Sequence, residues 1–181
     1  SPFSILAVTF TNKAASEMRG RIETLLSASL RGMWVGTFHG IAHRLLRSHL
    51  QEAHLPETFQ IIDSEDQLRL IRSIIKSLEI DDSRWPAKQA QWYICGKKDE
   101  GLRPEHIQIE DDLFTQTLVK IYIAYEDTCN RSGLVDFAEL LLRAHELWLH
   151  NPELLAHYQQ RFRHVLVDEF QDTNAIQYNW L

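Results

Sequence analysis

The sequence has few cysteines and no cysteine-rich motif. Only Cys95 and Cys129 occur among its 181 residues, and the two are not in a CxxC spacing. Disulfide-stapled secreted domains and structural zinc sites both need more cysteines at closer spacing. We therefore expect neither of these classes, and we expect a reducing, cytoplasmic setting.

Long hydrophobic runs are also absent. No apolar stretch approaches the roughly 20 residues that cross a bilayer, and the first residues, Ser1 to Ser4, lack the basic-then-apolar pattern of a secretory signal. The chain does not begin with Met and opens directly onto a strand-like run. We expect a segment of a longer protein with no membrane partner.

A third absence is an excess of positive charge. The formal net charge is -6, with six Lys and Arg against four Asp and Glu in residues 1–60, and thirteen against twenty-one in residues 61–181. A protein that holds nucleic acid by bulk positive charge would show the opposite balance. Any contact with nucleic acid must therefore be local, and the front of the chain is the better candidate.

Three short apolar runs are present: residues 5–10, 33–35 and 164–167. Continuous apolar runs of this length are typical of strands buried on both faces of a parallel sheet. The first two are followed by helix-like periodicity, with Thr11 or Asn12 and then Thr37 available as amino-terminal caps. This pattern predicts strand–loop–helix units.

From about residue 50 the strand-like pattern gives way to successive amphipathic helices. We predict helices starting near Ser64, Pro86, Leu113, Asp136 and Asn151, with capping boxes at Ser64–Gln67 and Asp136–Glu139 and a break between Gly96 and Gly101. Two further predictions concern side chains. The tryptophans on apolar helix faces, Trp85, Trp92 and Trp148, should lie in the core. A basic patch in a loop, formed by Lys97, Lys98 and Arg103, could contact duplex DNA or simply be solvated.

The fold class that follows is α/β, with a parallel-sheet domain interrupted by a mainly α-helical insertion. We place the sheet domain at residues 1–37 and 161–181, and the helical domain at residues 38–160. The last segment should hold a strand and a following helix.

Two acids, Asp168 and Glu169, follow the third apolar run directly. Ligands of open parallel α/β sheets bind beyond the carboxyl ends of the strands. One carboxylate there can hold Mg²⁺ while its neighbour orients or deprotonates a water molecule in phosphoryl transfer. A strand that merely ends in solvated acids would look the same, so the pair alone leaves both interpretations open.

The wider motifs resemble those of the UvrD/Rep-type superfamily-one DNA helicases. Residues 165–174 (VLVDEFQDTN) look like the Walker B motif of that family, residues 7–15 (AVTFTNKAA) like its first DNA-contact motif, and residues 36–40 (GTFHG) like its second. Residues 134–141 (LVDFAELL) also look like a family signature. The resemblance spans nearly the whole chain.

This resemblance implies a RecA-like P-loop NTPase domain and an ATP-dependent helicase that moves along single-stranded DNA and unwinds duplex DNA in repair. ATP and Mg²⁺ would be its cofactors. DNA repair proteins would be possible partners, and the protein would be located in the cytoplasm at the nucleoid. Asp168 would bind Mg²⁺, Glu169 would activate water, and Gln171 would sense the nucleotide phosphate or couple it to DNA. The DNA contacts implied are Phe10, Thr11, Asn12, Lys13, Thr37, Phe38 and His39.

The phosphate-binding loop of that family is absent, because no GxxxxGK[ST] occurs in the sequence. We therefore expect this chain alone not to hydrolyse ATP. Two other classes stay open: a non-catalytic binding module built on the helical domain, and a metal-dependent nuclease using Asp168, Glu169 and Asp172. A metal pair at His39 and His43 is disfavoured, since no third ligand is evident.

Overall fold

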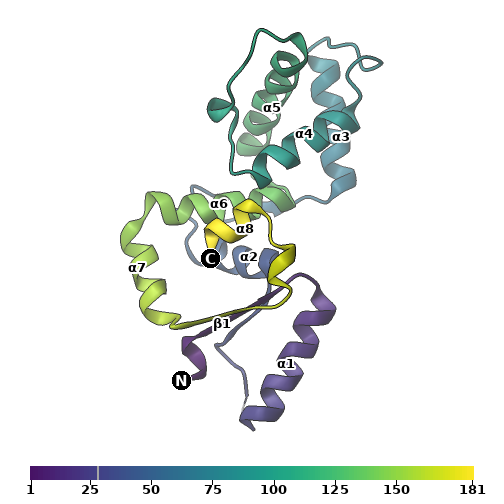
Figure 1. Cartoon of the computed structure of the whole chain (residues 1–181). Coiled ribbons are helices and arrows are strands. Elements are labelled where there is room, and N and C mark those ends of the chain that lie inside the picture. The colour runs from purple at the N-terminus through teal and green to yellow at the C-terminus, as the bar shows by residue number, and fades with distance from the viewer. Residues whose placement is uncertain (28) are drawn as a thin grey trace. The chain divides into compact units, whose positions relative to one another are not determined.

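The structure is a computed structural model that describes residues 1–27 and 29–181. The chain is mixed α/β and divides into two compact units (Figure 1). Unit 1 consists of residues 1–54 and 143–181, and unit 2 consists of residues 55–142. Unit 2 thus lies between the two segments of unit 1 along the chain.

Unit 1 contains a parallel sheet with the strand order β2-β1-β5. The strands are β1 (Ile5–Thr9), β2 (Trp34–Thr37) and β5 (His164–Val167). Ala7 and Val8 of the central strand are completely buried. The prediction of parallel strands is confirmed.

Helices α1 (Asn12–Leu26) and α2 (Phe38–Ser48) begin just after the first two strands. The hydroxyl of Thr11 accepts a hydrogen bond from the Ala14 amide at 3.1 Å, and that of Thr37 accepts one from the Gly40 amide at 3.0 Å. Both threonines therefore cap their helices as predicted.

An aromatic cluster completes the core of unit 1. Trp34 of β2 lies edge-on to Tyr158, with ring centroids 5.6 Å apart, and Trp148 stacks on Trp180 at 6.3 Å. These rings come from α6 (Phe137–His150), α7 (Pro152–Arg161) and α8 (Ala175–Trp180). Short 3-10 turns at η1 (Pro2–Ser4) and η3 (Phe170–Asp172) precede β1 and follow β5.

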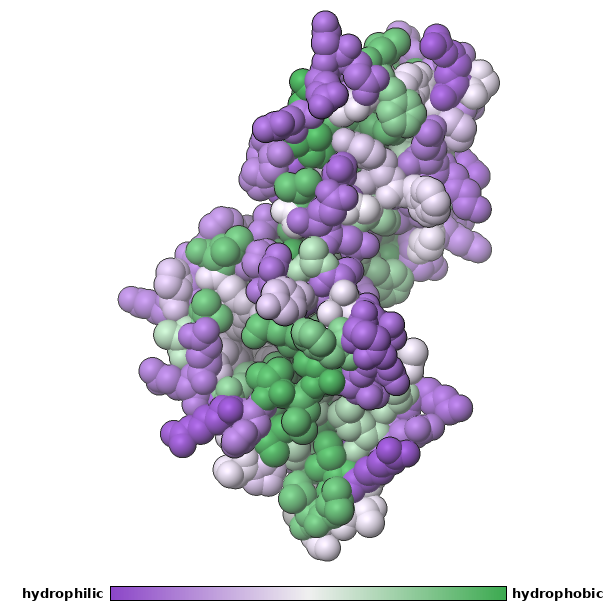
Figure 2. Space-filling model, in the orientation of Figure 1, coloured by the Kyte–Doolittle hydropathy of each residue, from purple (hydrophilic) through white to green (hydrophobic). Residues whose placement is uncertain are grey.

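The prediction that the third strand is buried on both faces is wrong. Val165 is 43% exposed and Leu166 is 54% exposed. The physical reason is position, since β5 pairs only with β1 among the described strands and forms an edge of the sheet. Figure 2 shows apolar side chains gathered on the visible face of unit 1.

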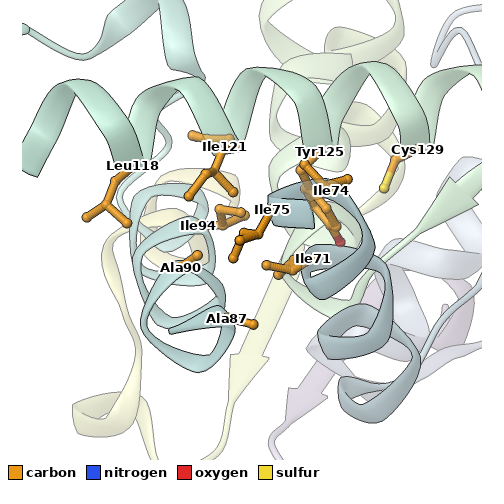
Figure 3. Packing of buried hydrophobic residues seen from close by; sticks show 11 residues of the cluster. Ile71, Ile74, Ile75, Ala87, Ala90, Ile94, Leu118, Ile121, Tyr125 and Cys129 are labelled. Carbon is orange, nitrogen blue, oxygen red and sulfur yellow. The ribbon is translucent and has the colours of Figure 1, made fainter. Parts of the chain in front are cut away.

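Unit 2 is built from α3 (Ser64–Ser77), α4 (Ala87–Asp99) and α5 (Leu113–Ser132), with a 3-10 turn η2 (Pro104–His106). Their apolar faces meet in one cluster (Figure 3). Ile75, Ile94 and Ile121, one from each helix, are almost completely buried in it. Gly133 ends α5 with φ +62°, a left-handed conformation that suits glycine.

Several local predictions for this unit need correction. A two-residue parallel pair, β3 (Gln60–Ile61) with β4 (Leu134–Val135), lies in the mainly α-helical region, where no strand was predicted. Two residues are too few to show the alternation by which a strand is recognised. Asp63 caps α3 in place of Ser64. Helix α4 continues through Gly96 to Asp99.

Two of the three residues in the expected basic loop patch are buried. Lys98 is 2% exposed, and its ammonium lies 2.8 Å from the carboxylates of both Asp136 and Glu139. The guanidinium of Arg103, itself 8% exposed, donates to Glu139 at 2.7 and 2.9 Å and to Glu126 at 2.5 Å. The hydroxyl of Tyr125 donates to Asp136 at 2.6 Å. We call these six residues the buried ion network.

The network accounts for the acids of the 134–141 motif. The side chain of Asp136 also accepts a hydrogen bond from the Glu139 amide at 2.7 Å and so caps α6, as predicted. Burial works to lower the pKa of Lys98, but Glu139 and Asp136 outweigh it and raise that pKa above the usual value. Lys98 is therefore a charged structural residue and not a surface contact.

The bounds of the two units differ from the expected domain ranges. Helix α2 and α7 belong to unit 1, because Leu45 and Leu46 of α2 are buried there and Tyr158 of α7 packs on Trp34. The side-chain prediction for Trp92 is also wrong, since it is 85% exposed. Among the helices of the described residues, none combines the length and the hydropathy needed to span a membrane.

Candidate functional site at the carboxyl edge of the sheet

The three strands of unit 1 end at the same edge of the sheet. Their register pairs Thr9 with Thr37 on one side of β1, and Val8 with Val167 on the other. The residues that follow each strand, at positions 10, 38 and 168, are therefore neighbours at this carboxyl edge. Parallel α/β sheets bind ligands there.

Asp168 is anchored at this edge by β1. Its amide donates to the carbonyl of Val8 at 3.0 Å, and the hydroxyl of buried Thr9 donates to its Oδ2 at 3.5 Å. The Asp168 side chain is otherwise exposed. Thr9 was not predicted as a site residue; its only signal was a polar residue at the end of an apolar run.

Glu169 has an unusual backbone conformation, with φ +53°. A glutamate in the left-handed region is strained by about 1–3 kcal/mol, and such residues cluster at functional sites. The Gln171 amide donates a short hydrogen bond to the Glu169 carboxylate. The structure thus brings Asp168, Glu169 and Gln171 together in one exposed turn after β5.

The loop after β1 lies beside the start of α2. Thr11, Asn12 and Lys13 are exposed, while the ring of Phe10 is half-buried and lies 5.2 Å from the ring of Phe38. Phe38 itself is 1% exposed. The prediction of Phe38 as a direct DNA contact needs correction, because its ring packs in the core under Phe10.

Burial lowers the pKa of His39 below its usual value. The imidazole is therefore neutral at pH 7 and can donate one hydrogen bond and accept another. His43, four residues later, accepts a hydrogen bond from Arg47 at 3.2 Å. Within the described residues, neither these histidines nor the acids at 168, 169 and 172 form a group of three metal ligands, so the nuclease alternative gains no support.

A groove of about 280 Å³ opens next to Thr37, between the first turns of α1 and α2. Asn12, Thr37 and Gly40 line it, together with Arg19 and Arg44, which donate to the carbonyls of Val35 and Met33. The guanidinium groups of Arg19 and Arg44 give the groove positive charge, which favours an anion. The groove can therefore accept a phosphate or another small anion.

Comparison with known proteins agrees with these motifs. Residues 1–181 match the model of the UvrD/REP helicase N-terminal domain. The chain is 63% identical over 181 residues to DNA helicase II of Escherichia coli (strain K12). This alignment covers 100% of the chain and 25% of that protein. It is 62% identical over 181 residues to DNA helicase II of Salmonella typhimurium (strain LT2), with the same coverage.

A more distant relative is ATP-dependent DNA helicase PcrA of Leuconostoc citreum, which is 40% identical over 179 residues, 98% of this chain and 24% of that protein. The chain therefore spans about a quarter of the length of the curated relatives it matches. The family resemblance inferred from the motifs is confirmed, and the match extends over the whole chain. The chain belongs to the UvrD/REP helicase N-terminal domain family.

Proposed function

We propose that this chain is part of an ATP-dependent DNA helicase that translocates on single-stranded DNA and unwinds duplex DNA. The observation that supports this most is the carboxyl edge of unit 1. There, Asp168 is hydrogen-bonded to Thr9, and the exposed cap and first residues of α1, at positions 11–13, follow the same strand. The turn proposed to bind the nucleotide and the residues proposed to bind DNA are therefore both held by the central strand β1.

The residues of the turn after β5 suit a magnesium nucleotide. Mg²⁺ prefers carboxylate and water oxygens, and the exposed carboxylate of Asp168 meets that preference. When bound, Mg²⁺ with ATP would supply the phosphoryl group and neutralise its charge. Glu169 would orient and deprotonate the attacking water, and Gln171 would hold the Glu169 carboxylate through their hydrogen bond.

DNA would lie along the edge formed by the residues that directly follow β1 and by the start of α2. Thr11, Asn12 and Lys13 would contact phosphates, and the exposed part of Phe10 would stack on a base. Thr37 and neutral His39 would donate hydrogen bonds without bulk positive charge. Phe38 would support Phe10 from below, since their rings are in contact.

The remaining assignments follow from the family and are part of the same proposal. Unit 1 would be a portion of a RecA-like motor domain, and unit 2 would be the accessory helical domain inserted in it. The phosphate-binding loop and a second motor domain would come from the rest of the protein, so this chain alone would not hydrolyse ATP. We also propose a DNA repair role in the cytoplasm, at the nucleoid.

The catalytic assignment is tested by Glu169→Gln in a protein that contains this chain with its flanking motor segments. The variant should bind ATP normally but lose about 10²- to 10⁴-fold in DNA-stimulated ATP hydrolysis, the usual contribution of a general base. Asp172→Asn is the matched control, because Asp172 is an exposed acid of the same turn without an assigned role. Undiminished hydrolysis by Glu169→Gln would refute the assignment.

The DNA assignment is tested by Phe10→Ala in the same protein. Loss of one base-stacking platform should weaken binding of single-stranded DNA by about 5- to 150-fold. Anisotropy titrations across a salt series measure this, and the salt slope should stay constant because no phosphate contact is removed. An affinity equal to that of the parent protein would exclude stacking on Phe10.

A further inference from the structure

A second surface with the chemistry of a nucleic-acid site lies in unit 2, and it contains none of the residues assigned above. A groove of about 750 Å³ runs between α3 and α4, and we call it the α3–α4 groove. Arg72 and Lys76 line it from α3, and Lys88 lines it from α4. All three side chains belong to exposed residues.

These cations are available for a ligand. Over residues 1–27 and 29–181, no salt bridge joins Arg72, Lys76 or Lys88 to a carboxylate, whereas Arg69, one turn before Arg72, is paired with Asp66. Arg72 and Lys76 are four residues apart, so they project from the same face of α3. The groove therefore presents three cations that, among the described residues, are held in no salt bridge.

Two carboxylates moderate this positive charge. Asp81 and Asp82, in the loop between the helices, also line the groove, which leaves a net charge of +1 from three cations and two acids. The Asp81 carboxylate accepts hydrogen bonds from the hydroxyl and the amide of Ser83, at 2.6 and 3.0 Å, and these bonds lower its pKa. Asp81 is therefore an ionised acid tied into its own turn, and both Asp81 and Asp82 oppose an anionic ligand.

An exposed aromatic ring continues the same surface along α4. Trp92 lies four residues after Lys88, on the same helix face, and is 85% exposed. Gly96 lies four residues further, and a side chain built there would meet no atom within 4 Å. The helix surface one turn beyond Trp92 is therefore unobstructed, and the exposed indole is accessible to a flat ring from a ligand.

We propose that the α3–α4 groove and Trp92 form a second binding site for single-stranded DNA. The strand's phosphates pair with Arg72, Lys76 and Lys88, and one unpaired base stacks on Trp92. A cationic groove beside an exposed aromatic ring is the arrangement by which proteins hold single strands without sequence preference. A duplex offers no free base face along its length, so the tryptophan favours a single strand over a duplex.

The site goes beyond the proposed helicase function, because it uses none of the residues at the carboxyl edge of unit 1. The direct test is anisotropy of a fluorescein-labelled oligothymidylate of about 16 nucleotides, a length typical of single-strand sites, with the 181-residue chain. Lys76→Ala/Lys88→Ala should reduce the salt slope by about 1.4, since each single-strand phosphate contact contributes about 0.7. The matched control, Lys120→Ala/Arg131→Ala, removes the same charge from exposed positions on α5 and should leave the slope unchanged.

Trp92→Ala should weaken binding by about 5- to 150-fold without changing the salt slope. Single-stranded DNA should quench part of the tryptophan fluorescence of the parent chain, and Trp92→Ala should lose this quenching. Asp82→Asn should tighten binding, because it removes one of the two opposing carboxylates from the groove. All the substituted residues are exposed, so the far-ultraviolet circular dichroism of every variant should match that of the parent chain.

The proposal is overturned if the groove double variant loses no more than its α5 control, or if Trp92→Ala binds as tightly as the parent chain. Equal affinity for a 16-base-pair duplex, with no dependence on Trp92, would also overturn it. Phe10→Ala separates this site from the proposed function. If only that variant loses binding, DNA contacts unit 1 alone and the α3–α4 groove has no role.

Discussion

The two units place the same kinds of charged residue in opposite surroundings. At the carboxyl edge of unit 1, Asp168 and Glu169 are exposed, and the side-chain partners recorded for them are one hydroxyl and one amide. In the buried ion network of unit 2, Asp136 and Glu139 are buried and bonded to Lys98 and Arg103. Both pairs of acids lie in motifs that resemble family signatures.

This comparison shows that burial and ion pairing distinguish carboxylates that can take part in catalysis from carboxylates that stabilise the fold. An exposed, weakly bonded carboxylate can exchange partners with a metal ion or a water molecule, as phosphoryl transfer requires. A buried carboxylate held by two cations cannot do so without a large desolvation cost. The acids of unit 1 are thus candidates for catalysis, and those of unit 2 hold the helical unit together.

The largest effect is expected from breaking the buried ion network. Lys98→Met leaves Asp136 and Glu139 without their shared ammonium and should reduce the free energy of unfolding by about 3–5 kcal/mol. Urea denaturation of the 181-residue chain, followed by circular dichroism, measures this. Lys97→Met is the control, since its surface ion pair with Glu100 contributes about 1 kcal/mol or less.

A second variant keeps this prediction testable if Lys98→Met fails to fold. Adding Asp136→Asn removes the carboxylate that is left without a cation, since Glu139 keeps its ion pair with Arg103, and it retains an oxygen that can cap α6. The double variant should therefore be more stable than Lys98→Met alone. Equal stability of Lys98→Met and the Lys97 control would show that the network does not stabilise the unit.

An intermediate effect is expected at the turn after β5, where the strained backbone of Glu169 lowers the free energy of unfolding. Glu169→Gly should relieve the positive φ and raise the free energy of unfolding by about 1 kcal/mol. Glu169→Gln removes the charge but keeps the strain, so it should show no such gain. If both variants changed stability equally, the carboxylate and not the backbone would be the cause.

The smallest effect is expected from Asp99, an acid next to the buried ion network. Burial, Asp136 and Glu100 raise its pKa above the ordinary value, so the folded state binds the proton more tightly than the unfolded state. Ionised Asp99 therefore costs stability at neutral pH, and the cost disappears as the pH falls through the raised pKa.

Asp99→Asn should consequently stabilise the chain at pH 7 and make no difference below about pH 3.9, the ordinary value for aspartate. Urea denaturation over a pH series measures the change. Exposed Asp127→Asn is the matched control. A stabilisation that persists in strong acid would contradict the electrostatic explanation.

The sequence by itself determined the elements whose signals are local. Caps at Thr11, Thr37 and Asp136 were all predicted, because each depends on a few neighbouring residues. The motifs also determined the family, because the residue types and their order along the chain can be read without knowing the fold. The pattern of parallel strands also predicted that Asp168 lies at the carboxyl edge of the sheet.

Only the tertiary structure decided which side chains reach solvent. Lys98 and Trp92 both lie on α4, and sequence reasoning assigned the lysine to a surface loop and the tryptophan to the core; the structure reverses both. The physical reason is that burial depends on partners distant in sequence. Asp136 and Glu139 make a buried lysine tolerable from about 40 residues away, and no local pattern records that pairing.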